Sequence, residues 1–302
     1  MGAKGLYNSG GLAHALGDYA AARSRLEEAA SLCREIGDRP GLAIALTYLG
    51  ILELSQGNPK AARAYLTESL GILREYGTPW WQALSLWRLG DAVLGSGDAP
   101  ATRSLYEESL ALFRSVGDPW GTAFALNSLG RLAAIEGRNA AARSLYSESK
   151  GLFRQVGDKW GRGTELFGEG FAALHEGAYE DAEALFDEHV CLWRELGNRA
   201  GVARSLMGFA ALALAFSQTK SSSAPDEARV KQARRGAVLL AASDGLAKAQ
   251  GVRLLPWDQG EFDHWLAAAH AQLDDAAFAA AWAEGRAMTL EQALALAGDR
   301  NR

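Results

Sequence analysis

The stretch GDPWGTAFALNSLG, residues 117–130, decides the fold because the chain contains close relatives of it. GTPWWQALSLWRLG ends at Gly90 and GDKWGRGTELFGEG ends at Gly170, so these copies follow one another at intervals of 40 residues. Four single-residue registers keep the same interval: Gly10, Gly50, Gly90, Gly130 and Gly170; Gly17, Gly57, Gly97, Gly137 and Gly177; Gly37, Gly77, Gly117, Gly157 and Gly197; Arg34, Arg74, Arg114, Arg154 and Arg194. A fixed period of about 20 to 50 residues is the signature of a repeat architecture. The sequence therefore predicts one structural unit repeated along the chain.

Each unit has the pattern of two amphipathic helices, since its apolar residues recur at spacings of three and four. In the fourth unit we expect helices over residues 119–136 and 140–156, with Gly137 opening the turn between them. An alanine near the start of the second helix allows close helix approach, and a large apolar residue four positions later fills the space between hairpins. These pairs are Ala22 and Leu26, Ala62 and Leu66, Ala142 and Tyr146, and Ala182 and Phe186, with Thr102 in place of alanine before Tyr106. The unit is predicted to be a helical hairpin.

The GDPWG segment is interpreted as the joint between two hairpins. Gly117 suits the left-handed conformation that ends a helix, Asp118 can cap the next helix, and Pro119 fits its first turn. Trp120, like Trp80 and Trp160 in the neighbouring units, is expected to be a wedge between consecutive hairpins.

A leucine-glycine pair, a glycine seven residues on, an alanine five further and then a large apolar residue resemble the tetratricopeptide repeat. The pair occurs at residues 49–50, 89–90 and 129–130. The period of 40 residues exceeds the roughly 34 of that repeat, and the extra residues lie mostly in the second helix. The resemblance implies an all-α, right-handed superhelical solenoid of helical hairpins, in which the first helices line a concave groove.

Longer repeats of this kind resemble the C-terminal regions of bacterial signalling ATPases of the STAND class and of their LuxR-type relatives among transcription regulators. The segment FAAAWAEGRAMTLEQAL, residues 278–294, is similar to the terminal segment of those regulators. The resemblance implies a nucleotide-binding module ahead of the repeats. The sequence contains no G-x-x-x-x-G-K-[ST] phosphate-binding loop, so an ATPase module would belong to another part of a full-length chain. No cofactor is expected.

The repeat register ends after the first helix of a sixth unit. We expect a repeat array over residues 1–216, a flexible loop over residues 217–227, where Ser and Pro gather, and a C-terminal helical cap over residues 228–302. A solenoid needs an atypical end that covers its last apolar surface.

Within the expected cap, a helix is predicted over residues 260–273. Asp274 is a typical N-cap for the next helix, and Thr289 with Gln292 forms a capping box for the last one. The aromatic residues suited to cover the end of the array are Phe262, Trp265, Phe278 and Trp282.

Composition disfavours several classes of partner. The formal net charge of −5 offers no general attraction to a phosphate backbone, so direct nucleic-acid binding is not expected. The longest apolar run, near residues 210–216, is too short to span a bilayer as a helix, so no membrane span is expected. No basic segment followed by an apolar signal core begins the chain, and the cytoplasm is the expected compartment.

Metal and catalytic sites are not predicted. No two of the five histidines have the i, i+4 spacing of a helical zinc motif. The glutamates at positions 68, 108, 148 and 188 recur once per unit, which favours exposed ion pairs with arginines over unique active-site acids. Cys33 and Cys191 belong to distant units and are expected to be free thiols within packed helices. The chain is expected not to be an enzyme.

Recognition is expected where the units differ. Three residues before the glycine of the leucine-glycine pair, and one residue after it, side chains vary between units and share a helix face. The candidate groove residues are Trp87, Arg88, Asp91, Asn127, Arg131, Phe167, Phe171 and His175. Aromatic residues beside an arginine are typical of binding hot spots. The alternative is that these aromatic residues pack against the next hairpin.

Three functions are compatible with this pattern. The first is a sensor or protein-interaction module of a signalling ATPase or transcription regulator, whose groove takes a peptide, a protein or a small effector. The second is a stand-alone adaptor that assembles partner proteins. The third, an enzyme on a helical-repeat body, lacks any supporting motif.

Overall fold

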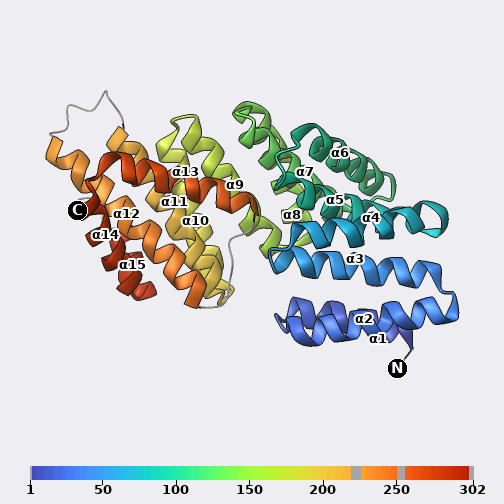
Figure 1. The fold of residues 1–302 in the computed structure, drawn as a ribbon. Coiled ribbons are helices and arrows are strands. Elements are labelled where there is room, and N and C mark those ends of the chain that lie inside the picture. The colour runs from blue at the N-terminus through green and yellow to red at the C-terminus, as the bar shows by residue number, and fades with distance from the viewer. Residues whose placement is uncertain (1, 219–225, 250–255, 299–302) are drawn as a thin grey trace. The chain divides into compact units, whose positions relative to one another are not determined.

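The computed structural model describes residues 2–218, 226–249 and 256–298, which form fifteen α-helices and no strand (Figure 1). The helices are α1 (Ala3–Ala15), α2 (Tyr19–Ile36), α3 (Arg39–Ser55), α4 (Pro59–Tyr76), α5 (Pro79–Leu94), α6 (Ala99–Ser115), α7 (Pro119–Ile135), α8 (Asn139–Val156), α9 (Lys159–His175), α10 (Tyr179–Glu195), α11 (Arg199–Gln218), α12 (Asp226–Ala249), α13 (Pro256–Gln272), α14 (Asp275–Ala287) and α15 (Leu290–Gly298). The two helices expected for the fourth unit are α7 and α8, each within one residue of the predicted bounds. The prediction of an all-helical solenoid of hairpins is confirmed.

By their packing, the helices form two compact units. Unit 1 comprises Met1–Leu132 with Gly151–Val156, and unit 2 comprises Ala133–Lys150 with Gly157–Arg302. In unit 1, α1 packs against α2, α3 against α4 and α5 against α6. In unit 2, α9 packs against α10 and α11 against α12. Each unit is thus a stack of helical hairpins.

Glycines of the register that contains Gly90 and Gly170 lie where the two helices of a hairpin touch. A Cβ atom built on Gly90 would lie 2.5 Å from Cε1 of Tyr106, and one built on Gly170 would lie 2.6 Å from Cε1 of Phe186. Both aromatic side chains are fully buried. A side chain on either glycine would push the helices apart, because protein interiors leave no room for an extra methyl group. The glycine and the large residue predicted from the repeat are therefore partners within one hairpin.

The joints between hairpins follow the GDPWG prediction. Gly117 has a φ angle of +66°, and Oδ2 of Asp118 accepts a hydrogen bond of 3.3 Å from the backbone N–H of Gly121. Asp38 caps α3 in the same way, with a bond of 2.9 Å from the N–H of Gly41. The exception is Gly77, whose φ is −88° and which is followed by Thr78 without a side-chain cap.

The three tryptophans of the joints do not share one role. Trp80 joins consecutive hairpins, since its Nε1 donates to Oδ2 of Asp118 at 2.6 Å. Trp120 packs against Trp87 of the preceding first helix, with ring centroids 6.0 Å apart. The wedge prediction is wrong for Trp160, which is 56% exposed and touches Trp193 of its own hairpin. A wedge requires burial, and this ring lies mostly in solvent.

Helix α11 is the central core helix of unit 2. Among the described residues it alone is long and apolar enough to cross a membrane by length and composition, and 83% of its apolar window is buried inside the protein. The core helix of a soluble protein passes the same test, so this feature is weak support for a membrane span. The expectation that no helix could span a membrane considered only uninterrupted apolar runs. It therefore did not identify this helix as long and apolar enough.

The C-terminal elements differ from their expected bounds. Helix α11 runs to Gln218 and α12 begins at Asp226, so the ends of the expected loop 217–227 are helical and its remainder, residues 219–225, lies outside the described residues. Helix α13 begins at Pro256, earlier than the expected start at residue 260. Helix α12 packs along α11 as the second helix of a hairpin packs against the first. The division into an array, a loop and a cap stays a proposal.

Both predicted helix caps of the C-terminal region are present. Oδ1 of Asp274 accepts a bond of 2.8 Å from the N–H of Ala277. Thr289 and Gln292 bond reciprocally, at 3.2 Å and 2.8 Å, which is the predicted capping box. Of the four aromatic residues expected to cover the core, Phe262 and Trp265 are buried and the other two are half-buried.

Candidate partner-binding face

The first helices of the unit 1 hairpins lie side by side. His14 of α1 hydrogen-bonds Ser55 of α3 at 2.8 Å, and Thr47 of α3 hydrogen-bonds Ser85 of α5 at 2.8 Å. The next contact runs from α5 to α7, where Trp87 Nε1 donates to Ser128 Oγ at 2.8 Å. These contacts align one face of α3, α5 and α7.

Residues at i, i+4 and i+7 share a helix face, so each of these helices presents three positions in the same register. We call this surface the unit 1 face, and it consists of Ile44, Tyr48 and Ile51 on α3, Leu84, Arg88 and Asp91 on α5, and Phe124, Ser128 and Arg131 on α7. Most of these side chains are half-buried, whereas Leu84, Asp91 and Ser128 are buried. The surface is apolar on α3 and carries arginines on α5 and α7.

A buried carboxylate organises the two arginines. Asp91 is 1% exposed, and its Oδ1 accepts hydrogen bonds from the Tyr106 hydroxyl at 2.8 Å and from Arg131 Nη2 at 3.1 Å. Its Oδ2 accepts from Arg88 Nη1 at 3.2 Å. A charge removed from water persists only when it is paired and hydrogen-bonded, and Asp91 meets both conditions. The carboxylate therefore fixes both guanidinium groups.

The part of the cluster that reaches the surface is formed by its two guanidinium groups. Two guanidinium groups surround one carboxylate, and the side chains of Arg88 and Arg131 are 24% and 18% exposed. The Arg88 guanidinium carbon lies 3.6 Å from the centroid of the Trp87 ring, a cation–π contact that further restricts it. Burial, with a contribution from the positive Arg88, lowers the pKa of His14, which is therefore neutral at pH 7. The exposed part of the cluster is cationic.

Some buried donor atoms in and beside the cluster make no hydrogen bond within the described part of the chain. They include Nε of Arg88 and Nδ2 of Asn127, a residue that is only 4% exposed. Burial of a donor without an acceptor costs stability, so the packing of the hairpins does not explain these atoms.

The structure brings together most of the predicted groove residues of unit 1, but in different roles. Arg88, Asp91 and Arg131 form the cluster. Trp87 is 3% exposed and its ring lies 5.0 Å from that of Phe124, so it packs against the next hairpin, which is the alternative interpretation. A role for Asn127 in binding stays a prediction.

Sequence reasoning missed Tyr106 and Ser128 as members of the cluster. Tyr106 was interpreted as packing alone, although its hydroxyl donates to Asp91. A usable signal was present, because Leu26 and Leu66 become Tyr106 in the same unit in which Ile51 becomes Asp91. A hydroxyl and a carboxylate that appear together in one repeat indicate a buried pair.

In unit 2, the corresponding face of α9 and α11 is covered by α13. Figure 1 shows α13 running across these helices, and His175 Nε2 lies 2.9 Å from Oε1 of Glu261 on α13. Arg204 of α11 forms an ion pair with Asp258 of α13. The Trp265 ring stacks on His175 with an interplanar angle of 17°. The hydrogen bond that His175 donates to Glu261 raises the pKa of His175 against the opposing effect of burial.

The prediction of an open groove at Phe167, Phe171 and His175 is therefore wrong. Phe167 and Phe171 are 3% and 4% exposed and share an apolar core with Trp265 of α13. His175 is held by Glu261. The cause is α13, whose position the repeat register could not reveal.

Unit 2 also contains a buried acid that the sequence interpretation missed. Glu165 of α9 is fully buried, and neither of its carboxyl oxygens has a hydrogen-bond partner within the described residues. Burial, with a contribution from the nearby Glu169, raises its pKa to about 8. Glu169 itself is paired with Lys150 at 3.1 Å. Glu165 is thus mostly protonated at neutral pH.

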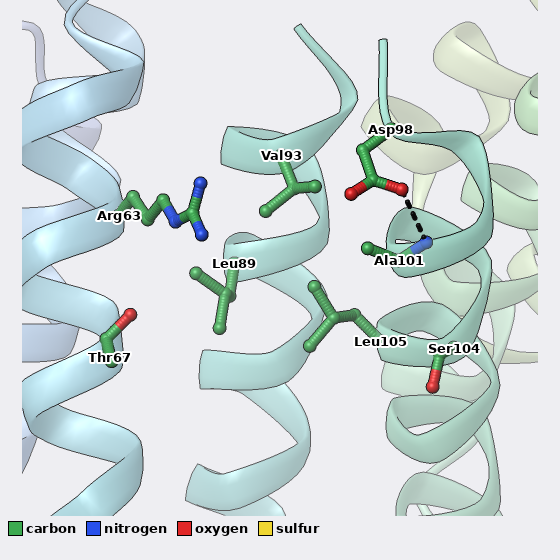
Figure 2. A pocket seen from close by; sticks show the side chains of 8 residues that line it. All are labelled: Arg63, Thr67, Leu89, Val93, Asp98, Ala101, Ser104 and Leu105. Carbon is green, nitrogen blue, oxygen red and sulfur yellow. Dashed lines mark hydrogen bonds between the residues drawn. The ribbon is translucent and has the colours of Figure 1, made fainter. Parts of the chain in front are cut away.

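A shallow cleft of about 310 Å³ lies between α4, α5 and α6 of unit 1 (Figure 2). Arg63 points toward Leu89 and Val93 across it, whereas its counterpart one unit earlier, Arg23, forms an ion pair of 2.6 Å with Glu53. Asp98, the only acid in its lining, caps α6 through Ala101 N–H at 3.0 Å. The carboxylate of Asp98 is thus engaged in capping α6.

Among the described residues, no group of three or more His, Cys, Asp and Glu side chains could hold a metal ion. Both cysteines are free, and Cys33 is buried as expected. Cys191 is exposed, which corrects the expectation that both thiols lie within packed helices.

Known proteins share the repeat pattern and the fold of this chain. Residues 3–75 and 81–155 match the model of the tetratricopeptide repeat family, so this part of the chain is built of such repeats. No curated protein sequence matches the chain significantly.

Solved structures resemble nearly the whole chain. One is a signal transduction ATPase with numerous domains (STAND) with a tetratricopeptide repeat sensor from Pyrococcus horikoshii, at 16% identity and a TM-score of 0.59 over 93% of this chain. Another is the apo form of RapI, at 14% identity and a TM-score of 0.59 over 88% of this chain and 97% of RapI. A third is aspartyl phosphate phosphatase F from Bacillus subtilis, at 10% identity and a TM-score of 0.59, covering 88% of this chain and 69% of that protein. The chain spans only 43% of the STAND protein, and at these identities the likeness shows the fold alone.

Proposed function

We propose that this chain of tetratricopeptide repeats is a non-catalytic scaffold that binds a peptide or protein partner on the unit 1 face, at Arg88 and Arg131. The observation that carries the proposal is the pair of partly exposed guanidinium groups held by the buried Asp91. A preorganised arginine loses little conformational entropy on binding, and its planar fork suits carboxylates and backbone carbonyls. Half-buried Tyr48 and Phe124 supply apolar contact area beside the charges.

The repeats are further proposed to be the sensor part of a larger cytoplasmic signalling ATPase or LuxR-type transcription regulator. Support comes from the likeness in fold to a STAND protein with a tetratricopeptide repeat sensor, of which this chain spans 43%. The similarity of residues 278–294 to the terminal segment of such regulators adds to it. On this proposal, partner binding biases an ATPase switch elsewhere. The gene sequence upstream of Met1 tests it, since an in-frame P-loop module supports the sensor role and its absence contradicts it.

A stand-alone adaptor is the second candidate. The observation that favours it is the match to RapI, because this fold accounts for 97% of that protein without a further module. A small effector in place of a peptide is an additional possibility for either candidate.

Affinity capture with the tagged chain tests the binding role of the unit 1 face. Arg88→Gln and Arg131→Gln each keep a hydrogen-bond donor for Asp91 and remove the positive charge, so the fold should persist. We expect either variant to lose most of the captured partner while its circular dichroism and Tm stay near those of the parent chain. Arg63→Gln, an exposed arginine outside the face, is the matched control and should capture the partner normally. Equal capture by all four chains would contradict the proposal.

A further inference from the structure

In unit 2, the face formed by the first helices α9 and α11 is covered by α13, and the residues of α13 show what kind of element fits such a face. Helix α13 lies on α9 and α11 and contributes two acids one turn apart, Asp258 and Glu261, to the cations Arg204 and His175. The two acids are three residues apart, so they project from one side of α13. The occupant of this face is an acidic helix.

Aromatic groups anchor α13 beside its acids. Trp265 is 4% exposed, stacks on His175 and donates from Nε1 to Oε2 of Glu261 at 3.1 Å. Phe262 is 6% exposed and belongs to the same core as Phe171. Buried aromatic anchors framed by charged pairs are the usual source of binding energy at a helix-in-groove contact.

The unit 1 face has the same chemistry but no such helix. Its cations are Arg88 and Arg131, and its apolar groups are Tyr48, Ile51 and Phe124. Within the described residues of unit 1, the helices pack in sequence along the array, and unit 1 has no counterpart of α13. The guanidinium groups of Arg88 and Arg131 are partly exposed, which complements an acidic partner and disfavours a basic one.

We propose that the partner segment taken by the unit 1 face is an amphipathic helix that carries two acids one turn apart and an adjacent aromatic anchor, the chemistry that α13 presents to unit 2. This inference rests on the proposed function, because it names the partner class for the same surface. The acids meet Arg88 and Arg131, and the aromatic side chain packs over Tyr48, Ile51 and Phe124.

The test uses the full chain and a labelled synthetic peptide with the sequence of residues 258–272, DQGEFDHWLAAAHAQ, whose binding is followed by fluorescence anisotropy. We expect the peptide with Asp258→Lys and Glu261→Lys to bind about tenfold more weakly or worse, and binding to weaken as salt rises. The chain variants Arg88→Gln and Arg131→Gln should each weaken binding similarly, whereas Arg63→Gln should not. A photoreactive group at the position of Trp265 should cross-link to α3, α5 or α7.

Three results would overturn the inference. They are no binding at millimolar peptide, equal binding of the charge-reversed peptide, and loss of binding on Arg204→Gln with cross-links to α9 or α11, which would mean exchange with α13 in unit 2. The peptide comparison needs no chain variant, so it decides the matter even where a variant fails to fold. If partner capture depends on Arg88 and Arg131 while the peptide does not bind, the proposed function stands and only the partner class is wrong. If neither partner capture nor peptide binding depends on Arg88 and Arg131, the proposed function and the proposed partner class are both wrong.

Discussion

The faces of unit 1 and unit 2 are built on one 40-residue register, yet their surroundings differ. In unit 2, α13 covers the face through His175 and Arg204, and the aromatic residues beneath it belong to the core. In unit 1, the arginines stay partly exposed over a buried carboxylate. The repeat register thus determines which face the first helices share, and α13, which lies outside the register, covers that face in unit 2. The predictions below separate residues that build the two faces from residues that act on them.

The largest effect is expected for Trp87→Ala. Trp87 is buried between hairpins, so its truncation should lower the free energy of unfolding by about 3 to 5 kcal/mol. Trp160→Ala, at the joint that precedes α9 and 56% exposed, should cost less than about 0.5 kcal/mol. Urea denaturation followed by circular dichroism measures both. A small loss of stability for Trp87→Ala would show that Trp87 is not a packing residue and would support its predicted role in partner binding.

Removal of the buried carboxylate should be nearly as costly. Asp91→Ala leaves two partly buried guanidinium groups without their acceptor, which should cost about 3 kcal/mol. Glu68→Ala breaks the exposed ion pair with Arg34, 3.4 Å long, and should change stability by less than about 0.5 kcal/mol. If the Asp91 variant were as stable as the parent chain, the cluster would not be held by its carboxylate.

Glu165 is the opposite case, a buried acid whose oxygens have no hydrogen-bond partner among the described residues. Its pKa is raised in the folded state to about 8 from an ordinary 4.5, so ionisation penalises folding increasingly as pH rises from 4.5 to 8. Glu165→Gln should therefore stabilise the chain, by a few kcal/mol at pH 8 and by little at pH 4.5. Thermal melts at several pH values measure the difference between variant and parent. A difference that did not change with pH would show that the pKa of Glu165 is the same in the folded and the unfolded chain.

The smallest effect concerns the hold of α13 on unit 2. Because Glu261 raises the pKa of His175, the pair contributes its full stabilisation below pH 6.5 and loses it as pH rises through the raised pKa. Glu261→Gln should increase amide hydrogen exchange in α13 a few-fold at pH 6, with a smaller difference at pH 8 after correction for the intrinsic rate. Helix α4 of unit 1 serves as the internal reference. Equal protection of the α13 amides in both chains at pH 6 would show that this ion pair does not hold α13 on unit 2.

Much of the fold could be predicted from the sequence because it depends on local signals. The glycine register, the caps at Asp118 and Asp274, and the small-then-large pattern each act within one hairpin or one turn. The candidate site could be predicted only in part. The register placed Arg88, Asp91 and Arg131 on one face, but it gave no measure of the burial of Trp87, which depends on the size of Phe124 and Trp120 in the next unit.

The covered face of unit 2 could not be predicted for a different reason. Helix α13 lies outside the repeat, and its contacts with His175 and Arg204 join positions 86 and 54 residues apart in sequence. No periodic pattern encodes such a contact. The unpartnered Glu165 was also invisible, because glutamate on a helix is usually a surface residue and only the packed structure shows that this one is buried.

The contact between Gly90 and Tyr106, or between Gly170 and Phe186, has a genetic consequence. Each pair lies 16 residues apart inside a single hairpin, so a recombination event that deletes or duplicates 40 codons in phase carries the complete contact with it. Neighbouring hairpins then meet through the same kinds of surface as before. The number of hairpins can therefore change without loss of the packed core. A deletion out of phase with the 40-residue repeat would separate the glycine from its aromatic partner, and the two helices could not pack closely.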